Sequence, residues 1–236
     1  MLPQEFTSPL SPFEIEAMLL SLKVGVWSMI GAMPIAIALA WVLARRDFVG
    51  KSLVDALLHL PLVLPPVSIG FILLILFGRQ GWLGKPLADW FGITVMFKWQ
   101  GAAIASAVMA LPLTVGAIRL SIAAVDQKLE AAARSLGASR LDVFFSVTLP
   151  IAFPGLIAGA ILGFARSLGE FGATITFVST IPGETETLPL AMYRALQSPQ
   201  GDTQALRLTV IAVVIALCAL VGANLLTRWA TARGAR

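Results

Sequence analysis

The sequence predicts an all-α integral membrane protein with about five membrane-spanning helices. Of its 236 residues, 58% are hydrophobic and only 13% are charged, whereas soluble domains are typically about one quarter charged. The mean hydropathy is +0.87, and several uncharged runs reach the roughly twenty residues that a helix needs to cross the hydrocarbon core of a bilayer. The surface that meets water is therefore expected to be small.

Five apolar segments are long enough to cross a membrane, and we expect each of them to be a helix. A further segment, residues 172–196, begins apolar but is interrupted by Pro182, Gly183, Glu184 and Glu186. We expect a re-entrant or external segment there, with a sixth span as the alternative. The five predicted spans are residues 24–44, 56–78, 99–118, 150–171 and 208–227.

Lysine and arginine residues indicate the orientation, because cytoplasmic loops carry an excess of both. Basic residues gather in segments 45–51, 128–140 and 228–236, and the other connections carry fewer. An odd number of spans then places the N-terminus outside and the C-terminus in the cytoplasm. The important consequence is that residues 123–149 face the cytoplasm.

Two proline and glycine patterns stand out within the predicted spans. Pro65 and Pro66 are the best hinge candidates, because two consecutive prolines remove helix hydrogen bonds most severely. A fixed kink that aids packing is the alternative interpretation. Gly155, Gly159 and Gly163 lie on one helix face at a spacing of four, which predicts close packing against a neighbouring helix.

A charged pair lies deep in the fourth predicted span. Arg166 and Glu170 are four residues apart, so their side chains share a helix face and can form an ion pair. A helix that starts at Pro150 places Arg166 roughly 24 Å deep, toward the outer leaflet. A pair that only fixes helix packing and a pair that gates a pore mouth remain equally open. A strong anion site is not favoured, because Glu170 offsets the positive charge of Arg166.

Composition argues against several other classes of protein. Cys218 is the only cysteine and His59 the only histidine, so an intrachain disulfide, a cysteine metal cluster and a catalytic centre are not expected. The chain has no G-x-x-x-x-G-K-[ST] loop for binding nucleotide. The net charge of +4 suits basic cytoplasmic loops and suggests no nucleic-acid partner. No catalytic residue, metal ligand or cofactor is therefore predicted.

The segment from 129 to 150 is charged between two apolar regions and reads as a pair of short amphipathic helices. Helix-forming residues run to 136, Gly137 suits a helix end or turn, and a second helix is expected to start near Ser139. This helix would show Leu141 together with two phenylalanines on one face. The segment is either a helix lying on the membrane surface or a docking element for a soluble partner.

The spacing within this segment resembles the EAA coupling motif of bacterial ABC importer permeases. In that motif Glu-Ala-Ala is followed by three residues, Gly, nine residues, Ile, any residue and Leu-Pro. Gly137 sets the register, and the family's Glu position is taken by Ala131, with Glu130 one residue earlier. The resemblance implies that residues of a two-helix cytoplasmic loop couple the chain to an ATPase. These residues are Glu130, Ala132, Ala133, Gly137, Leu141, Val147, Leu149 and Pro150.

A second resemblance covers residues 13–229 and concerns the molybdate importer permeases. Residues 164–172, F-A-R-S-L-G-E-F-G, are similar to a sequence found in these permeases and in their sulfate relatives. Residues 181–189, I-P-G-E-T-E-T-L-P, and residues 59–66, H-L-P-L-V-L-P-P, fit the molybdate branch better. The expected function is thus alternating-access import of molybdate or tungstate, with a sulfate or thiosulfate importer permease as the alternative.

These resemblances also imply an architecture and a set of partners. The fold would be the transmembrane domain of a type I ABC importer, spanning residues 13–230, with a coupling loop at 126–149. An external segment, 1–12, would precede it and a cytoplasmic tail, 231–236, would follow. The expected assembly is a homodimer in the lipid of the bacterial inner membrane, with a periplasmic N-terminus. Two cytoplasmic ATPase subunits would hydrolyse the ATP, and a periplasmic molybdate-binding protein would deliver the anion.

Overall fold

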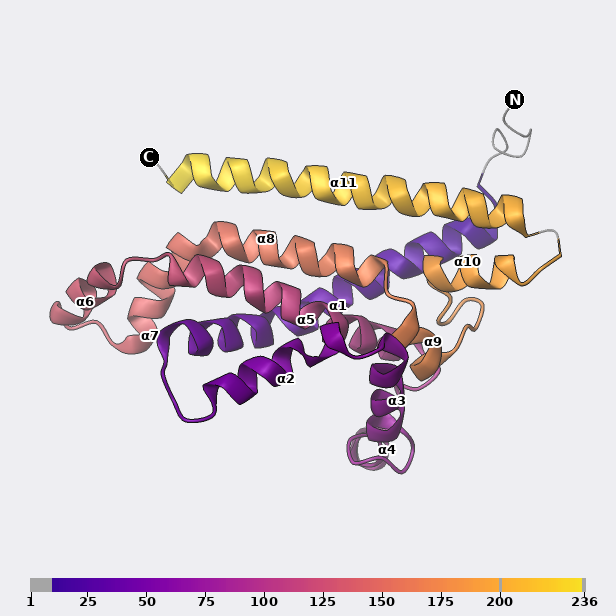
Figure 1. Cartoon of the computed structure of the whole chain (residues 1–236), viewed down its shortest axis with the longest axis horizontal. Coiled ribbons are helices and arrows are strands. Elements are labelled where there is room, and N and C mark those ends of the chain that lie inside the picture. The colour runs from indigo at the N-terminus through magenta and orange to yellow at the C-terminus, as the bar shows by residue number, and fades with distance from the viewer. Residues whose placement is uncertain (1–9, 200, 235–236) are drawn as a thin grey trace.

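The computed structural model describes residues 10–199 and 201–234, and every regular element in these ranges is helical (Figure 1). This confirms the all-α fold class. The elements are α1 (Pro12–Arg45), α2 (Lys51–Val63), α3 (Pro66–Phe77), α4 (Gly84–Phe91), α5 (Trp99–Ala123), α6 (Gln127–Ser135), α7 (Arg140–Val143), a π-helical turn (Phe144–Thr148), α8 (Leu149–Leu168), α9 (Gly172–Val178), α10 (Leu188–Leu196) and α11 (Asp202–Gly234).

The helices account for about five membrane spans, as predicted. Four continuous helices among the described residues are long and apolar enough to cross a membrane, and the bent pair of α2 and α3 adds a fifth if it counts as one span. Residues 172–196 form α9 and α10, which have seven and nine residues. Both are too short to cross the hydrocarbon core, which agrees with a re-entrant or external segment.

The first span begins well before its predicted start at residue 24. α1 starts at Pro12, after a capping box in which Ser11 and Glu14 bond to each other's backbone N–H groups. Glu14 is buried but forms an ion pair with Arg207 of α11 at 2.9 Å. The Lys23 ammonium lies 4.0 Å from the centre of the Trp99 ring, a favourable cation–π contact. Partners from other helices thus allow α1 to run through two charged positions.

The segment predicted as one span at 56–78 is instead two helices. α2 ends at Val63, α3 begins at Pro66, and their axes differ by 113°. Neither Pro65 nor Pro66 has an N–H to donate, so the helix ladder stops at this step. Figure 1 shows α3 and α4 turning away from the long axis of the bundle. The proline pair thus lies at a sharp break, and its role as a hinge rather than a fixed kink stays a prediction.

α8 begins at Leu149 with Pro150 in its first turn, as predicted, but it continues directly from the helical turns before it. The chain is helical without a break from Arg140 to Leu168, and the five residues Phe144–Thr148 form a wider π-helical turn. A proline ring in an α-helix clashes with the carbonyl four residues earlier. The wider turn directly before Pro150 is a known way to relieve such crowding, and turns of this kind often occur at functional sites.

The centre of the bundle consists of α1, α5 and α8, which pack closely through small residues. A Cβ added to Gly155 would collide with Ser121, one added to Gly159 with Ile118, and one added to Gly163 with Thr114. All three contacts are made with α5, so the glycine stripe packs against a helix as predicted.

The two ends of the long axis carry different elements (Figure 1). The end of α1, the loop of α6 and α7 and the end of α11 lie together at one end. The beginning of α1, α9 and α10 lie at the other end. α11 continues as a helix to Gly234, so most of the expected tail at 231–236 is helical. Residues 1–9 and 235–236, at the limits of the expected terminal segments, lie outside the described residues.

Candidate functional site

The loop between α5 and α8 is built from local capping signals. The Asp126 side chain accepts a hydrogen bond from the Lys128 N–H at 2.9 Å and so caps the start of α6. Gly137 has a φ of +91°, a left-handed conformation that glycine adopts without strain. Ser139 and Asp142 form a capping box at the start of α7. The structure therefore confirms the turn at Gly137 and the second helix near Ser139.

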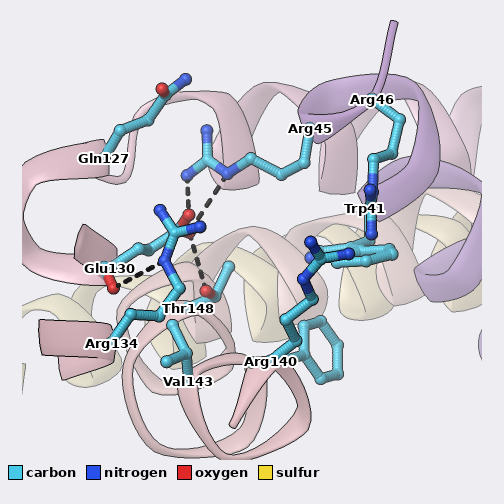
Figure 2. Close-up of a pocket in the computed structure, with 10 residues that line it drawn as sticks. Trp41, Arg45, Arg46, Gln127, Glu130, Arg134, Arg140, Val143 and Thr148 are labelled. Carbon is cyan, nitrogen blue, oxygen red and sulfur yellow. Dashed lines mark hydrogen bonds and ion pairs between the residues drawn. The ribbon is translucent and has the colours of Figure 1, made fainter. Parts of the chain in front are cut away.

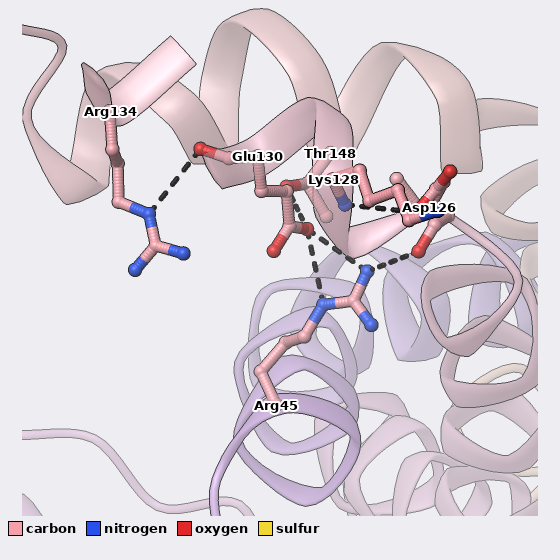
Figure 3. A network of polar contacts seen from close by, with 7 residues as sticks. Arg45, Asp126, Lys128, Glu130, Arg134 and Thr148 are labelled. Atoms are coloured by element: carbon pink, nitrogen blue, oxygen red, sulfur yellow. Dashed lines mark hydrogen bonds and ion pairs between the residues drawn. The ribbon is translucent and has the colours of Figure 1, made fainter. Parts of the chain in front are cut away.

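The Glu130 carboxylate points into the molecule rather than toward solvent (Figure 3). It accepts hydrogen bonds from two nitrogen atoms of Arg45, at 3.0 and 3.1 Å, and from the Thr148 hydroxyl at 2.8 Å. The same arginine donates to the Val125 carbonyl at 2.9 Å. Glu130 therefore ties α6 to the end of α1 and to the π-helical turn, and its carboxylate is occupied within the chain.

The outer surface of this loop exposes several large apolar side chains. Leu136 at the turn is 89% exposed and Leu141 on α7 is 70% exposed. Contiguous exposed apolar residues surrounded by polar ones are typical of a surface that another protein covers. The exposed residues of this kind on the loop are Leu129, Leu136, Leu141 and Phe145.

The remaining residues of the predicted coupling set divide between the outer surface and the interior. Ala132 and Pro150 are exposed, and Ala133 is half-buried. Val147 and Leu149 are also half-buried, and Leu149 packs against the core that α1, α5 and α8 share. The motif thus contains positions that can touch a partner and positions that anchor the loop to the spanning helices.

The predicted pair of Arg166 and Glu170 forms at the opposite end of α8. An Arg166 guanidinium nitrogen lies 2.7 Å from one Glu170 oxygen, and the other oxygen accepts the Ala173 N–H at 2.9 Å. Glu170 is almost fully buried, whereas the Arg166 side chain is 26% exposed. The carboxylate therefore neutralises Arg166 and also caps the first turn of α9.

The structure brings this ion pair and the break at Pro65–Pro66 into one region, because α9 packs on α3. A Cβ added to Gly172 would collide with Pro66, and one added to Gly70 would collide with the backbone of Ala173. A shift of α3 at Pro65–Pro66 would therefore press on α9, whose first turn Glu170 holds. The sequence suggested the hinge and the charged pair separately, with no sign that they touch.

An ion pair between α5 and α2 was also missed in the sequence. Arg119 of α5 lies 2.6 Å from Asp55 of α2, and the His59 ring nitrogen Nδ1 lies 2.8 Å from the Asp55 carbonyl oxygen. The predicted spans ended at residue 118 and began at residue 56, so both charges were left outside them. One charge directly beyond each boundary was the available signal that the two could pair.

The segment between α9 and α10 is held by its own side chains. The Thr185 hydroxyl donates to the Ser179 carbonyl at 2.9 Å and accepts the Ile181 N–H at the same distance. Glu186 is buried beside Arg194 at 2.8 Å, and burial raises the pKa of its carboxyl group. Within residues 10–199 and 201–234, no group of three or more His, Cys, Asp or Glu side chains is placed to hold a metal ion.

Known proteins with similar sequences cover nearly the whole chain. Over 220 residues it is 55% identical to the molybdenum transport system permease protein ModB of Haemophilus influenzae, covering 93% of this chain and 94% of that one. The protein of the same name in Escherichia coli is 54% identical over 94% of this chain and 97% of its own length. The sulfate transport system permease protein CysW of Synechococcus elongatus is 36% identical over 84% of this chain and 70% of that protein.

Solved structures of ABC transporters have the same fold. A bacterial alginate ABC transporter aligns with 96% of this chain and 82% of the matched chain, with a TM-score of 0.73 and 19% identity. A methionine ABC transporter in an inward-facing conformation aligns with 98% and 99%, with a TM-score of 0.67 and 16% identity. The fold is thus that of ABC importer transmembrane domains. Because residues 32–233 also match the family itself, the chain belongs to the binding-protein-dependent transport system inner membrane components.

Proposed function

We propose that this chain is the permease subunit of an ATP-driven importer that moves molybdate or tungstate across the bacterial inner membrane by alternating access. The observation that carries this proposal is the identity of 54–55% with two molybdenum transport permeases along almost the entire chain. A sulfate or thiosulfate importer permease is the second candidate. The lower identity of 36% with a sulfate permease makes it the weaker one.

The α6–α7 loop is the proposed contact with the ATPase. Its exposed leucines and Phe145 present an apolar surface, while Glu130 and Leu149 attach the loop to α1 and to the core. A movement of the ATPase against the outer face of the loop would be transmitted to the spanning helices through these attachments. The chain itself would hydrolyse no ATP, and two partner ATPase subunits would supply the energy.

The proposed orientation places this loop in the cytoplasm. The loop lies at the same end of the bundle as the C-terminal end of α11 (Figure 1), and the basic segments of the sequence fall on that side. The N-terminus is then periplasmic and the C-terminus cytoplasmic. The transmembrane domain covers residues 13–230, and the coupling loop covers residues 126–149.

The proposed assembly is a homodimer with the transport path on its two-fold axis. Five spans of one chain barely enclose a polar path from lipid, whereas two copies share its wall. A periplasmic binding protein would deliver the anion to the end where α9 and α10 lie. Arg166 and Glu170 would act there as a gating pair linked to the Pro65–Pro66 hinge, because the contact of α9 with α3 connects them.

The test is transport by the reconstituted complex of this permease, its ATPase and its binding protein in proteoliposomes. ATP-dependent accumulation of molybdate, with little accumulation of sulfate in competition, is the expected result. Preferential uptake of sulfate would instead support the second candidate, a sulfate or thiosulfate importer permease. Anion flux that continues at the same rate without ATP would contradict an importer altogether.

A further inference from the structure

A basic pocket lies between the end of α1 and the α6–α7 loop (Figure 2). Four guanidinium groups line it, those of Arg45, Arg46, Arg134 and Arg140, and Glu130 is the one acidic residue among its lining residues. Its volume is about 190 Å³, room for roughly six groups of the size of a water molecule. The pocket is therefore large enough for a small anion with its hydration.

The positive charge of this pocket is not balanced within the chain. The Glu130 carboxylate already accepts hydrogen bonds from Arg45 and Thr148. Within the described part of the chain, no carboxylate forms an ion pair with Arg46, Arg134 or Arg140. Arg134 donates one N–H to the Glu130 backbone carbonyl at 3.3 Å, which leaves its charge in place.

Arg46 and Arg134 are held by contacts that leave most of their N–H donors free. The Arg46 guanidinium lies 5.4 Å from the centre of the Trp41 ring, a cation–π contact that uses its face and not its N–H groups. Figure 2 shows Arg140 directed toward the same ring from α7. Guanidinium groups pair with phosphate oxygens through two parallel N–H donors, so a phosphate group matches the arginines that line this pocket from three elements.

The neighbouring residues favour a ligand at the membrane surface. Trp41 packs edge-on against Phe144, with ring centres 6.0 Å apart, and Phe48 and Val49 are exposed just after α1. Aromatic residues gather where spanning helices enter the headgroup region, and basic pockets between such helices on the cytoplasmic side bind acidic headgroups. We propose that the pocket binds the phosphate group of an anionic phospholipid of the cytoplasmic leaflet.

A headgroup bound there would connect α1 with both helices of the loop. It would neutralise Arg134 and Arg140, which otherwise repel each other and Arg46, and so hold the loop against the membrane. This inference rests on the orientation proposed above, with the loop on the cytoplasmic side. It does not depend on which anion the importer carries.

Native mass spectrometry of the intact complex with its ATPase tests the proposal. Complexes are released from nanodiscs of phosphatidylcholine alone or mixed with phosphatidylglycerol, and retained phosphatidylglycerol is counted. Arg134→Gln combined with Arg140→Gln should weaken phosphatidylglycerol binding about thirtyfold, since each basic residue near an acidic lipid surface contributes about a factor of five. The matched control, Arg79→Gln with Lys85→Gln, removes two exposed cations outside the pocket and should bind as the wild type does.

Equal phosphatidylglycerol binding by the two double variants would overturn the proposal. A second arm offers inorganic phosphate to complexes in phosphatidylcholine alone. If phosphate binds with the same dependence on Arg134 and Arg140, and phosphatidylglycerol does not displace it, the pocket is a site for free phosphate and the lipid assignment is wrong. The same spectra count ATPase subunits, so a failure of the proposed coupling role would appear separately, as wild-type complexes without ATPase.

Discussion

Glu130 in the α6–α7 loop lies 3.0 Å from Arg45 at the end of α1, although 85 residues separate the two in sequence. Their side chains are only 13% and 8% exposed, so this pair is shielded from solvent more than an ordinary surface ion pair. Its position makes it the main polar attachment of the loop to the first span. A loop that transmits force, as proposed for this one, needs such an attachment.

Replacing Glu130 with Gln should weaken the communication between the permease and its ATPase. Glutamine can still accept the Thr148 hydroxyl, but Arg45 would keep a largely buried charge without its partner, which costs on the order of 3 kcal/mol. We expect uptake and substrate-stimulated ATPase activity to fall together. The double variant Arg45→Gln, Glu130→Gln should recover part of both activities, because it leaves no unpaired charge.

The control for this experiment is Asp47→Asn, which breaks an ion pair with Lys51 in which the Asp47 side chain is fully exposed. Exposed pairs contribute little, so this variant should transport normally. Identical behaviour of the Glu130 and Asp47 variants would show that the attachment has no role in coupling.

Replacing Gly137 with Val should misplace α7 without preventing membrane insertion. A left-handed conformation costs a residue with a Cβ roughly 1–2 kcal/mol, and a β-branched side chain adds to the strain at a φ of +91°. Uptake and stimulated ATPase activity should both decrease. Gly31→Val is the control, because Gly31 lies within α1 and a Cβ there meets open space. Normal ATP-coupled uptake by Gly137→Val would contradict the assignment of the α6–α7 loop as the contact with the ATPase.

A variant in which Arg166 and Glu170 are exchanged should lose transport activity, although an ion pair between the two positions remains possible. Glu170 accepts the Ala173 N–H at the start of α9, and an arginine at this position has no acceptor to offer. Glu170→Gln retains an acceptor but loses the charge, so it should disturb gating less than the exchange does. Uptake is measured with expression levels matched. Full activity of the exchanged variant would mean that the cap on α9 is unimportant.

Much of the fold could be predicted because lipid imposes a simple rule on the sequence. Uncharged runs located α5 and the central part of α11, since a helix in lipid must be apolar along its length. The start of α1 could not be found in this way. Its charged residues Glu14 and Lys23 are compensated by Arg207 and Trp99, and these partners become neighbours only once the helices have packed.

The site was predictable where its geometry is local. The turn at Gly137 and the cap at Ser139 follow from residues within a few positions of each other, and both are present in the structure. The ion pair of Arg119 with Asp55 joins residues 64 positions apart in sequence. The pair of Glu130 with Arg45 joins residues 85 positions apart. Pairs of this kind depend on how the helices pack, which no local pattern reports.

The segment between α9 and α10 should become less stable as pH rises, because of Glu186. Burial raises the pKa of its carboxyl group and nearby Glu16 adds to this effect, against the opposing influence of Arg194 and the hydrogen bond from Thr180. The folded protein therefore holds this proton more tightly than the unfolded chain does. The stabilisation is complete below the ordinary pKa of 4.5 and is lost as pH rises through the higher value of the folded state.

Thermal unfolding in detergent, at pH values from below to above the ordinary pKa of 4.5, measures this loss of stability. The difference in Tm between wild type and Glu186→Gln should shift in favour of the variant as pH rises above 4.5, because glutamine stays neutral while the buried carboxylate acquires a charge. Glu184→Gln is the control, since Glu184 is exposed in the same segment and its replacement should leave the pH profile unchanged. A Tm difference that shifts in favour of wild type with rising pH would mean that the ion pair with Arg194 outweighs burial at Glu186.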